Sequence, residues 1–330
     1  MGVDTDLRRG GKNLSLWTRF SLLTPTANFN DLGYMRRNNY ITGSTGISLF
    51  NAQPVGTIRR LVFSPSGELS SSFTGQLQTK RLNTNWELTT EKFWQGRLVV
   101  GGNWPRLDLY ETRGGIAYEI PRHWWIVGSA STPTNRRATA SLRGAYGEQG
   151  GRPGPDMGLE LRLRPVDRLE LITSLDVNLV FSRPRWTTRS AAGEPVFGRG
   201  DLFSYTLVLR ATLGILPTLT LQSFNQLLYS TAHHEEFFIL TDPQTLVPTD
   251  PTPYLGLVDQ ALTSLISNSI LRWEYLPGSF LFVAYTHRTT LSEGGMEVRF
   301  EPKNGFTNLR ASGAANEDVI FVKLVHLFSL

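Results

Sequence analysis

Histidines and carboxylates come together most densely in the run His233-His234-Glu235-Glu236. Imidazole and carboxylate groups together suit zinc or iron, so this run is the first place to look for chemistry. Neighbouring side chains of an extended chain point to opposite faces, so only two of the four can easily share one ion. His233 and His234 are therefore weak metal candidates, and a solvent-exposed loop tip is the simpler interpretation.

Other chemistry has as little support. The sequence has no nucleophile elbow, phosphate-binding loop or zinc-protease motif. A hydrolase would have to combine groups from different loops, and only five histidines can serve as its base: His123, His233, His234, His287 and His326. Three nearby carboxylates offer calcium ligands without EF-hand spacing: Asp242, Asp250 and Asp259. We expect a non-enzymatic protein without catalytic residues, cofactor or dedicated metal site.

Most charged residues follow a different pattern. Between residues 157 and 181, leucines alternate with charged and polar residues at a period of two, as in a strand with one apolar and one polar face. A buried polar row needs water or partners of its own. We therefore expect these and similar residues to line the wet interior of a barrel, as either a selectivity-setting wall or a closing network: Arg143, Glu160, Arg162, Arg164, Glu170, Asp176, Arg210, Arg272, Glu274 and Lys323.

The elements that would position these residues are hairpins. The segment LRWEYLPGSFLFVAYT, residues 271–286, contains two alternating runs that flank Pro277 and Gly278, which predict a tight turn. Short proline turns are also predicted at Pro65, Pro121, Pro165 and Pro217. Longer connections rich in Gly, Pro, Asp and Thr are predicted at 147–156, 183–201 and 232–256. The first strand is expected in NLSLWTRFSLL, and the last, 318–330, is expected to end on Leu330.

Short turns at one rim and long loops at the other are typical of outer-membrane barrels. The predicted fold is therefore an all-β, transmembrane antiparallel β-barrel with short periplasmic turns and long extracellular loops. We expect about 14 strands, with a range of about 12–16, and an even number because antiparallel barrels close that way. Residues 1–330 would form one domain, either alone or as the C-terminal part of a larger barrel protein.

Composition narrows the class further. The chain has 330 residues, 40% apolar and 18% charged, which excludes a disordered or fibrous protein. It has no cysteine, which removes disulfides and thiolate metal sites. The formal charge is only +5 and no long Lys/Arg run occurs, so no nucleic-acid partner is expected. There is no apolar run long enough for a transmembrane helix and no signal peptide in these residues.

Two segments carry a resemblance to a known family: NDLGYMRRNN at 30–39 and NSILRWEYLPGSFLFVAYT at 268–286. They resemble the uncharacterised outer-membrane barrel domains that follow a family-nine-type carbohydrate-binding module in bacterial proteins. The segment FVKLVHLFSL is similar to the terminal recognition strand of outer-membrane proteins. The resemblance implies location and architecture, and no catalytic residue. Members normally carry sequence upstream, so the chain is expected to be a fragment or a shortened relative.

The predicted function is that of a porin-like pore or a membrane-embedded anchor in the outer membrane of a Gram-negative bacterium. The expected partners are outer-membrane lipid, the barrel assembly machinery and an envelope protein or carbohydrate, because the family's usual neighbour binds sugar. Two alternatives stay open. One is an outer-membrane hydrolase with a loop-borne site. The other is a soluble carbohydrate-binding β protein, whose apolar faces would have to pack together.

Overall fold

The computed structural model describes residues 2–27, 38–149, 152–181, 184–295 and 298–328. These residues form an all-β structure with one sheet of 17 strands and a separate two-stranded sheet. The first half of the chain contains β1 (Gly2–Gly10), β2 (Leu14–Leu23), β3 (Tyr40–Phe50), β4 (Ile58–Ser71), β5 (Leu77–Thr90), β6 (Gln95–Asn103), β7 (Arg106–Asp108), β8 (Tyr118–Ile120) and β9 (His123–Ser131).

The second half contains the longest strands. It comprises β10 (Ala138–Gln149), β11 (Arg152–Val166), β12 (Leu169–Phe181), β13 (Arg185–Arg189), β14 (Pro195–Leu216), β15 (Leu219–Asp242), β16 (Thr245–Thr249), β17 (Gln260–Leu276), β18 (Ser279–Gly294) and β19 (Ala315–Val325). Between β18 and β19 lie the helix α1 (Asn304–Thr307) and a 3₁₀ turn at Asn308–Arg310. Within the described residues, no helix is long and apolar enough to cross a membrane.

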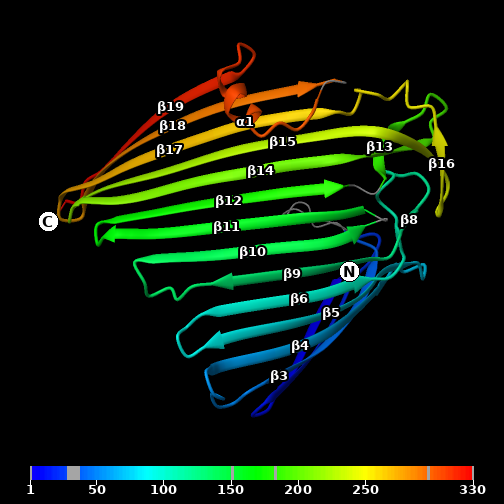
Figure 1. Ribbon diagram of the computed structural model, residues 1–330, viewed down its shortest axis with the longest axis horizontal. Helices are drawn as coiled ribbons and strands as arrows, with labels where there is room; N and C mark the ends of the chain where they lie inside the picture. Colours follow the sequence, from blue (N-terminus) through cyan, green and yellow to red (C-terminus); the bar gives the residue numbers. More distant parts are fainter. Residues whose placement is uncertain (1, 28–37, 150–151, 182–183, 296–297, 329–330) are drawn as a thin grey trace.

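The large sheet is an antiparallel meander (Figure 1). Successive strands pair with each other, except that β6 pairs with β9, β12 with β14, and β15 with β17. The short strands β13 and β16 pair only with the far ends of β14 and β15. Leaving these two aside, fifteen strands form the continuous meander from β1 to β19.

The two ends of the strands differ. We call turn end the border with the connections 11–13, 51–57, 91–94, 132–137, 167–168, 217–218 and 277–278. We call loop end the opposite border, where the chain makes long excursions such as 104–122, 243–259 and 298–314. Short turns at one border and several long connections at the other agree with the prediction in outline, although the loop end also contains the short connection 72–76 between β4 and β5.

Several turns were predicted at the wrong place. Pro65 lies inside β4 opposite Thr84, at a point where the ladder to β3 is interrupted, because proline lacks the N–H that a ladder uses. Pro165 belongs to β11, and Pro121 lies in the loop-end excursion. Of the five predicted proline turns, those at Pro217 and Pro277 are in turns at the turn end.

The long connections were also overestimated. Most of 147–156 belongs to β10 and β11, 183–201 contains β13 and the start of β14, and 232–256 contains the end of β15 and all of β16. β1 was missed, and β19 ends at Val325 rather than on the last residue. Strands in this protein extend beyond the length that one bilayer crossing needs.

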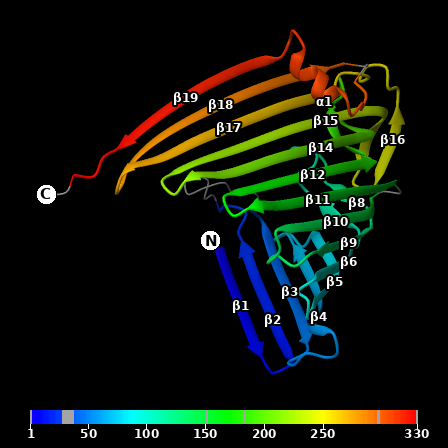
Figure 2. The same ribbon diagram turned by 60° about the vertical axis from the view of Figure 1, so that its left-hand side comes forward.

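The sheet does not form the closed barrel that was predicted. It is strongly bent, and β1 and β19 border an opening (Figure 2). β1 pairs only with β2 and β19 only with β18. The odd number of strands explains this: both edge strands run from the loop end to the turn end, so they cannot meet in antiparallel fashion.

Most strands of the meander have one polar and one apolar face, most clearly from β10 to β14, whereas β17–β19 carry apolar residues such as Ile270 and Phe282 on the face of the charged row. The cross-strand row Arg97, Ser129, Arg143, Gly158 and Asp176 marks what we call the polar face. The next row, which contains Gly96, Ala130, Leu142, Leu159 and Leu175, marks the apolar face. On β11 the apolar face is the more exposed one, with Met157, Leu159, Leu161 and Leu163 all exposed. The sheet therefore bends toward its polar face.

No second layer covers most of the apolar face in the described residues. One exception is the segment 298–311, which packs Phe300 and Leu309 against Tyr205, Leu227 and Tyr229 near the middle of β14 and β15. A second small core joins Tyr118 and Ile120 of β8 to Phe197 and Leu240 at the loop end of β14 and β15. These two cores cover only part of the apolar face.

Candidate functional site

The ten charged residues predicted for a wet interior share one face of the sheet. Arg143 lies beside Gly158, which lies beside Asp176, and Glu160 lies between Ser141 and Ser174 in the next row. Pairing across β12, β14, β15, β17, β18 and β19 places the others on the same face: Arg162, Arg164, Glu170, Arg210, Arg272, Glu274 and Lys323. The period of two therefore predicted their common face correctly, and their role remains a prediction.

These side chains form ion pairs along the polar face. Arg143 Nη1 lies 2.9 Å from Asp156 Oδ1, and Arg164 Nη2 lies 2.8 Å from Glu170 Oε1. Arg162 approaches the same Glu170 carboxylate at 3.8 Å. Because these groups are between a third and half exposed, each pair contributes about 0–1 kcal/mol to stability. Their main effect is to give the polar face a hydrophilic surface that carries both positive and negative charges.

A hollow of about 550 Å³ lies in the polar face between β5 and β12. Its floor consists of small residues on neighbouring strands: Ser129, Ser131, Ser141, Gly158 and Ser174. Its charged lining includes Glu87, Arg97, Arg143, Glu160 and Asp176. The hollow exists because serine and glycine leave space between long charged side chains, and the sequence alone did not reveal that these small residues align.

Residues 106–110 of the segment 104–122 lie beside Glu68 and Arg81 of the polar face near the loop end, and this arrangement was not predicted. The strand β7 packs on β5, and a cavity of about 450 Å³ between them is lined by residues that include Glu68, Arg81, Arg106 and Asp108. Farther along, Glu119 N donates to Pro243 O at 2.6 Å, and Gln244 Nε2 donates to Glu119 Oε2 at 2.7 Å. The segment thereby connects β5 to the β15–β16 turn.

His233 and His234 do not lie at a loop tip as predicted; they lie within β15. Both ring Nδ1 atoms contact the carboxylate of Asp259, at 2.7 Å and 3.1 Å, and His234 N donates to it at 2.9 Å. Asp259 is only 2% exposed. Both imidazoles therefore contact the same carboxylate, which links β15 to the start of β17. In the part of the chain that the structure describes, no group of three His, Cys, Asp or Glu side chains could hold a metal ion.

The other two calcium candidates have local roles. Asp250 accepts hydrogen bonds from Thr252 Oγ1 at 2.7 Å and from Thr252 N at 2.9 Å. The hydroxyl of Thr252 holds the pKa of Asp250 below its ordinary value. A hydrogen bond from Thr245 likewise lowers the pKa of Asp242. Both carboxylates therefore stabilise turns at the loop end.

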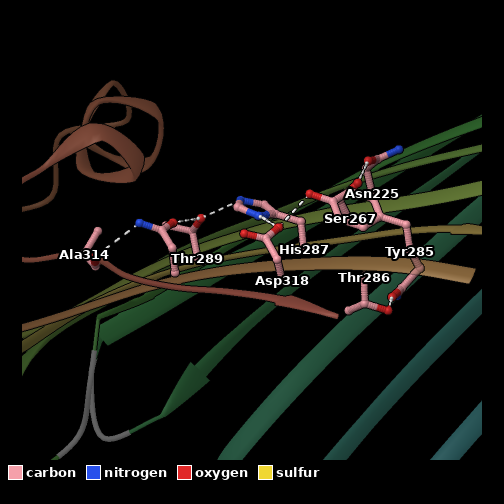
Figure 3. A network of polar contacts seen from close by, with 10 residues as sticks. Asn225, Ser267, Tyr285, Thr286, His287, Thr289, Ala314 and Asp318 are labelled. Atoms are coloured by element: carbon pink, nitrogen blue, oxygen red, sulfur yellow. Dashed lines mark hydrogen bonds and ion pairs between the residues drawn. The ribbon is translucent and has the colours of Figure 1, made fainter. Parts of the chain in front are cut away.

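A polar network interrupts the apolar face at β15–β19 (Figure 3). Tyr285 OH donates to Asp318 Oδ1 at 2.6 Å, and His287 Nδ1 lies 2.9 Å from the same oxygen. His287 Nε2 lies 2.9 Å from Thr289 Oγ1. On the neighbouring strands, Ser267 Oγ donates to Asn225 Oδ1 at 2.6 Å.

The order hydroxyl, imidazole and carboxylate is the one that acyl-transfer enzymes use. Here Thr289 is 2% exposed, and its hydroxyl donates to Asn316 Oδ1 at 2.7 Å rather than to the histidine. A nucleophilic hydroxyl must instead donate its proton to the imidazole, and it must be accessible to the substrate. The network instead joins β18 to β19, and the sequence did not predict it because the residues involved lie on separate strands.

These features define an all-β protein built on one large, open antiparallel sheet with a charged concave face and an apolar convex face. The chain belongs to the family described as Domain of unknown function (DUF5916), whose model matches residues 4–321. That match extends from β1 into β19. No curated protein sequence matches the chain.

The two segments that carried the sequence resemblance lie in different situations. Residues 268–286 form most of the β17–β18 hairpin around the turn 277–278. Residues 30–37 lie outside the described part of the chain. The family match therefore supports a common architecture for the sheet and supplies no reaction.

Proposed function

We propose that the chain is a membrane-embedded wall of an outer-membrane β-barrel in a Gram-negative envelope. Its apolar face contacts lipid, its polar face borders a passage for polar solutes, and it catalyses no reaction. The observation that carries this proposal is the separation of a polar and an apolar face over most of the meander, which is clearest from β10 to β14. A soluble antiparallel sheet would bury its apolar face, whereas a membrane sheet exposes it to lipid.

The extent of the exposed apolar face supports a lipid environment. Large apolar side chains that are exposed on it occur from the first strands to the last, for example Leu16, Ile47, Leu82, Leu142, Leu161, Leu209 and Val322. Monomeric soluble proteins rarely expose contiguous apolar patches larger than a few hundred Å². Contact with acyl chains removes this surface from water without a second protein layer.

The polar face supports a passage rather than a sealed interior. Ion-paired residues of both signs line the hollow, and β7 packs on β5 near the loop end. Rings of mixed charge select solutes by charge distribution. A connection to carbohydrate rests only on the family resemblance, and it makes a sugar or an envelope protein the first partner to test.

The two alternatives lack a comparable observation. A soluble carbohydrate-binding protein needs a packed apolar face, but the segment 298–311 covers only a small part of it in the described residues. A hydrolase needs an accessible nucleophile, and the one chain of hydroxyl, imidazole and carboxylate described above lacks it.

The experiment compares the same substitution on two neighbouring residues of β12. Leu175 lies on the apolar face, and Ser174 lies on the polar face beside Glu160. Leu175→Arg should weaken folding into lipid vesicles by about 2–4 kcal/mol, because it places a charge in the hydrocarbon region. Ser174→Arg should fold like the wild type. Equal effects, or full folding of both variants in lipid-free buffer, would contradict the proposal.

A further inference from the structure

A groove lies on the apolar face of the sheet, across β2 to β5 near the loop end. Its volume is about 550 Å³, and two neighbouring cross-strand rows supply most of its lining. The row nearer the loop end contributes Gly43, Leu69 and Lys80, and the next row contributes Thr45, Gly67 and Leu82. The groove is therefore a depression in the surface that the proposed function assigns to lipid.

Glycines form the floor of the groove. A Cβ atom added at Gly43 would meet no atom within 4 Å, so the space above this residue is open. A Cβ atom added at Gly67 would lie 3.2 Å from Leu82 Cδ2, so the leucine forms a wall beside the second glycine. The hydroxyl of Thr45 donates to Trp17 O at 3.1 Å and is thereby satisfied within the sheet. The floor and walls offer a mainly apolar surface to a ligand.

A single cation lies at the loop-end side of this groove. Lys80 is the fourth residue of β5 and the only charged residue that β2, β3, β5 and β6 place on the apolar face. It is exposed, and no carboxylate of the described residues pairs with it. Its ammonium lies 5.6 Å from the centroid of the Trp104 ring, which also lines the groove. Tryptophan and lysine together are typical of the level of lipid headgroups.

We propose that this groove binds one anionic phospholipid. An acyl chain lies over Gly43 and Gly67, and the lipid phosphate contacts the ammonium of Lys80. The inference rests on the proposed function, because it requires the apolar face to be in a membrane, and it adds a specific class of lipid to that face.

The chemistry of the groove selects this class of ligand. A sugar or a polar peptide would lose hydrogen bonds to water over the apolar floor without regaining them. A zwitterionic lipid fits the floor equally well, but its own cation offsets the attraction between its phosphate and the lysine. An anionic lipid satisfies both parts of the site, since one lysine near an anionic headgroup contributes about 1 kcal/mol, or about fivefold in affinity.

The test uses the full chain folded in detergent micelles. It is titrated with dioleoylphosphatidylglycerol and, separately, with dioleoylphosphatidylcholine, which has the same acyl chains and no net charge. Native mass spectrometry measures the fraction of the chain that carries one lipid.

Two substitutions change the site, and each has a matched control. Lys80→Gln removes the charge, and Lys92→Gln makes the same change in the turn 91–94. Gly43→Leu fills the groove, and Gly128→Leu places the same side chain on the apolar face of β9, where an added Cβ atom also meets no atom within 4 Å.

We expect the wild type to bind phosphatidylglycerol about fivefold more tightly than phosphatidylcholine. Lys80→Gln should abolish this preference, Gly43→Leu should weaken the binding of both lipids, and the two controls should bind like the wild type. A wild type without preference, or a preference that survives Lys80→Gln, would overturn the proposal. Equal binding by Gly43→Leu and Gly128→Leu would overturn it as well.

Flotation of the same proteins with lipid vesicles tests the membrane location separately. A wild type that floats but shows no lipid preference refutes only the phospholipid site. A wild type that does not float refutes the proposed function itself.

Discussion

At the scale of single residues, glycines decide where large side chains of the polar face can lie. Trp17 on β2 is directly opposite Gly46 on β3, and a Cβ atom added at Gly46 would lie 2.6 Å from the indole ring. A real Cβ never comes so close, so the tryptophan occupies the space that the missing side chain leaves. Such aromatic cover of a strand glycine fixes register.

This contact predicts the effect of Gly46→Ala. The substitution should lower the free energy of unfolding by about 1–3 kcal/mol, because the indole must leave its position. Gly43 lies in the same strand, and a Cβ added there would meet no atom within 4 Å. Gly43→Ala should therefore change stability much less. Urea unfolding of the folded protein in lipid, followed by tryptophan fluorescence, measures both; similar midpoints for the two variants would refute the contact.

The Asp259 carboxylate gives a second residue-scale prediction. Asp259→Asn replaces one acceptor oxygen by an amide group in a site that presents two imidazoles and a backbone N–H. We expect a loss of about 1–3 kcal/mol, the usual range for an unsatisfied buried polar group. Asp250→Asn, at an exposed turn, should have a small effect. Thermal unfolding checks both, and an unchanged Asp259→Asn would mean that the histidines hold the strand without the carboxylate.

Sequence alternation predicted the common face of ten charged residues, because residues two apart on a strand always share a face. The sequence placed His233 and His234 wrongly, because the polar composition of 232–256 indicated a loop. The chain instead continues as the strand β15 up to Asp242. Sequence alternation also could not find Asp259 as their partner, since strand register over a 26-residue separation is set by tertiary pairing.

At the scale of elements, the excursion 104–122 is held at two places: β7 packs on β5, and β8 packs on β14 and β15. Ile120 is 2% exposed and packs with Phe197 and Leu240, whereas Ile116 is 41% exposed. Ile120→Ala should therefore release β8, because removal of a buried isoleucine side chain costs about 2–5 kcal/mol. Ile116→Ala should not.

Limited proteolysis checks this element. The wild type and Ile116→Ala should resist cleavage within 104–122, and Ile120→Ala should be cut there while the large sheet stays intact. If all three proteins are cut equally fast, the small core of β8 does not hold the excursion 104–122 in place.

The type of element was more predictable than its borders. The hairpin 271–286 was predicted from alternation and a Pro-Gly turn, and it forms as expected. The turn predicted at Pro65 was wrong, because a strand can carry proline where one of its two ladders is interrupted. β1 was missed although Val3 and Leu7 alternate with Asp4 and Asp6, because the first strand was expected only in NLSLWTRFSLL, which forms β2.

At the scale of the whole molecule, the number of strands determines whether the two edge strands of the sheet run in the same or in opposite directions. The expected number of about 14 was close to the observed meander, yet the difference between even and odd changes the architecture. Sequence spacing estimates a count to within one or two strands. It does not determine whether the strand number is even or odd, and that decides whether the two edge strands can pair with each other in antiparallel fashion.

The measurement that tests the central claim most directly is cysteine accessibility along β12 in lipid vesicles. Single variants Ser174→Cys, Leu175→Cys, Asp176→Cys and Val177→Cys sample both faces in turn on a chain without native cysteine. We predict that a water-soluble maleimide labels positions 174 and 176, and that probes at 175 and 177 are quenched by bromine-labelled lipid. Equal labelling of all four positions, or the opposite alternation, would contradict a sheet with lipid on one face and water on the other.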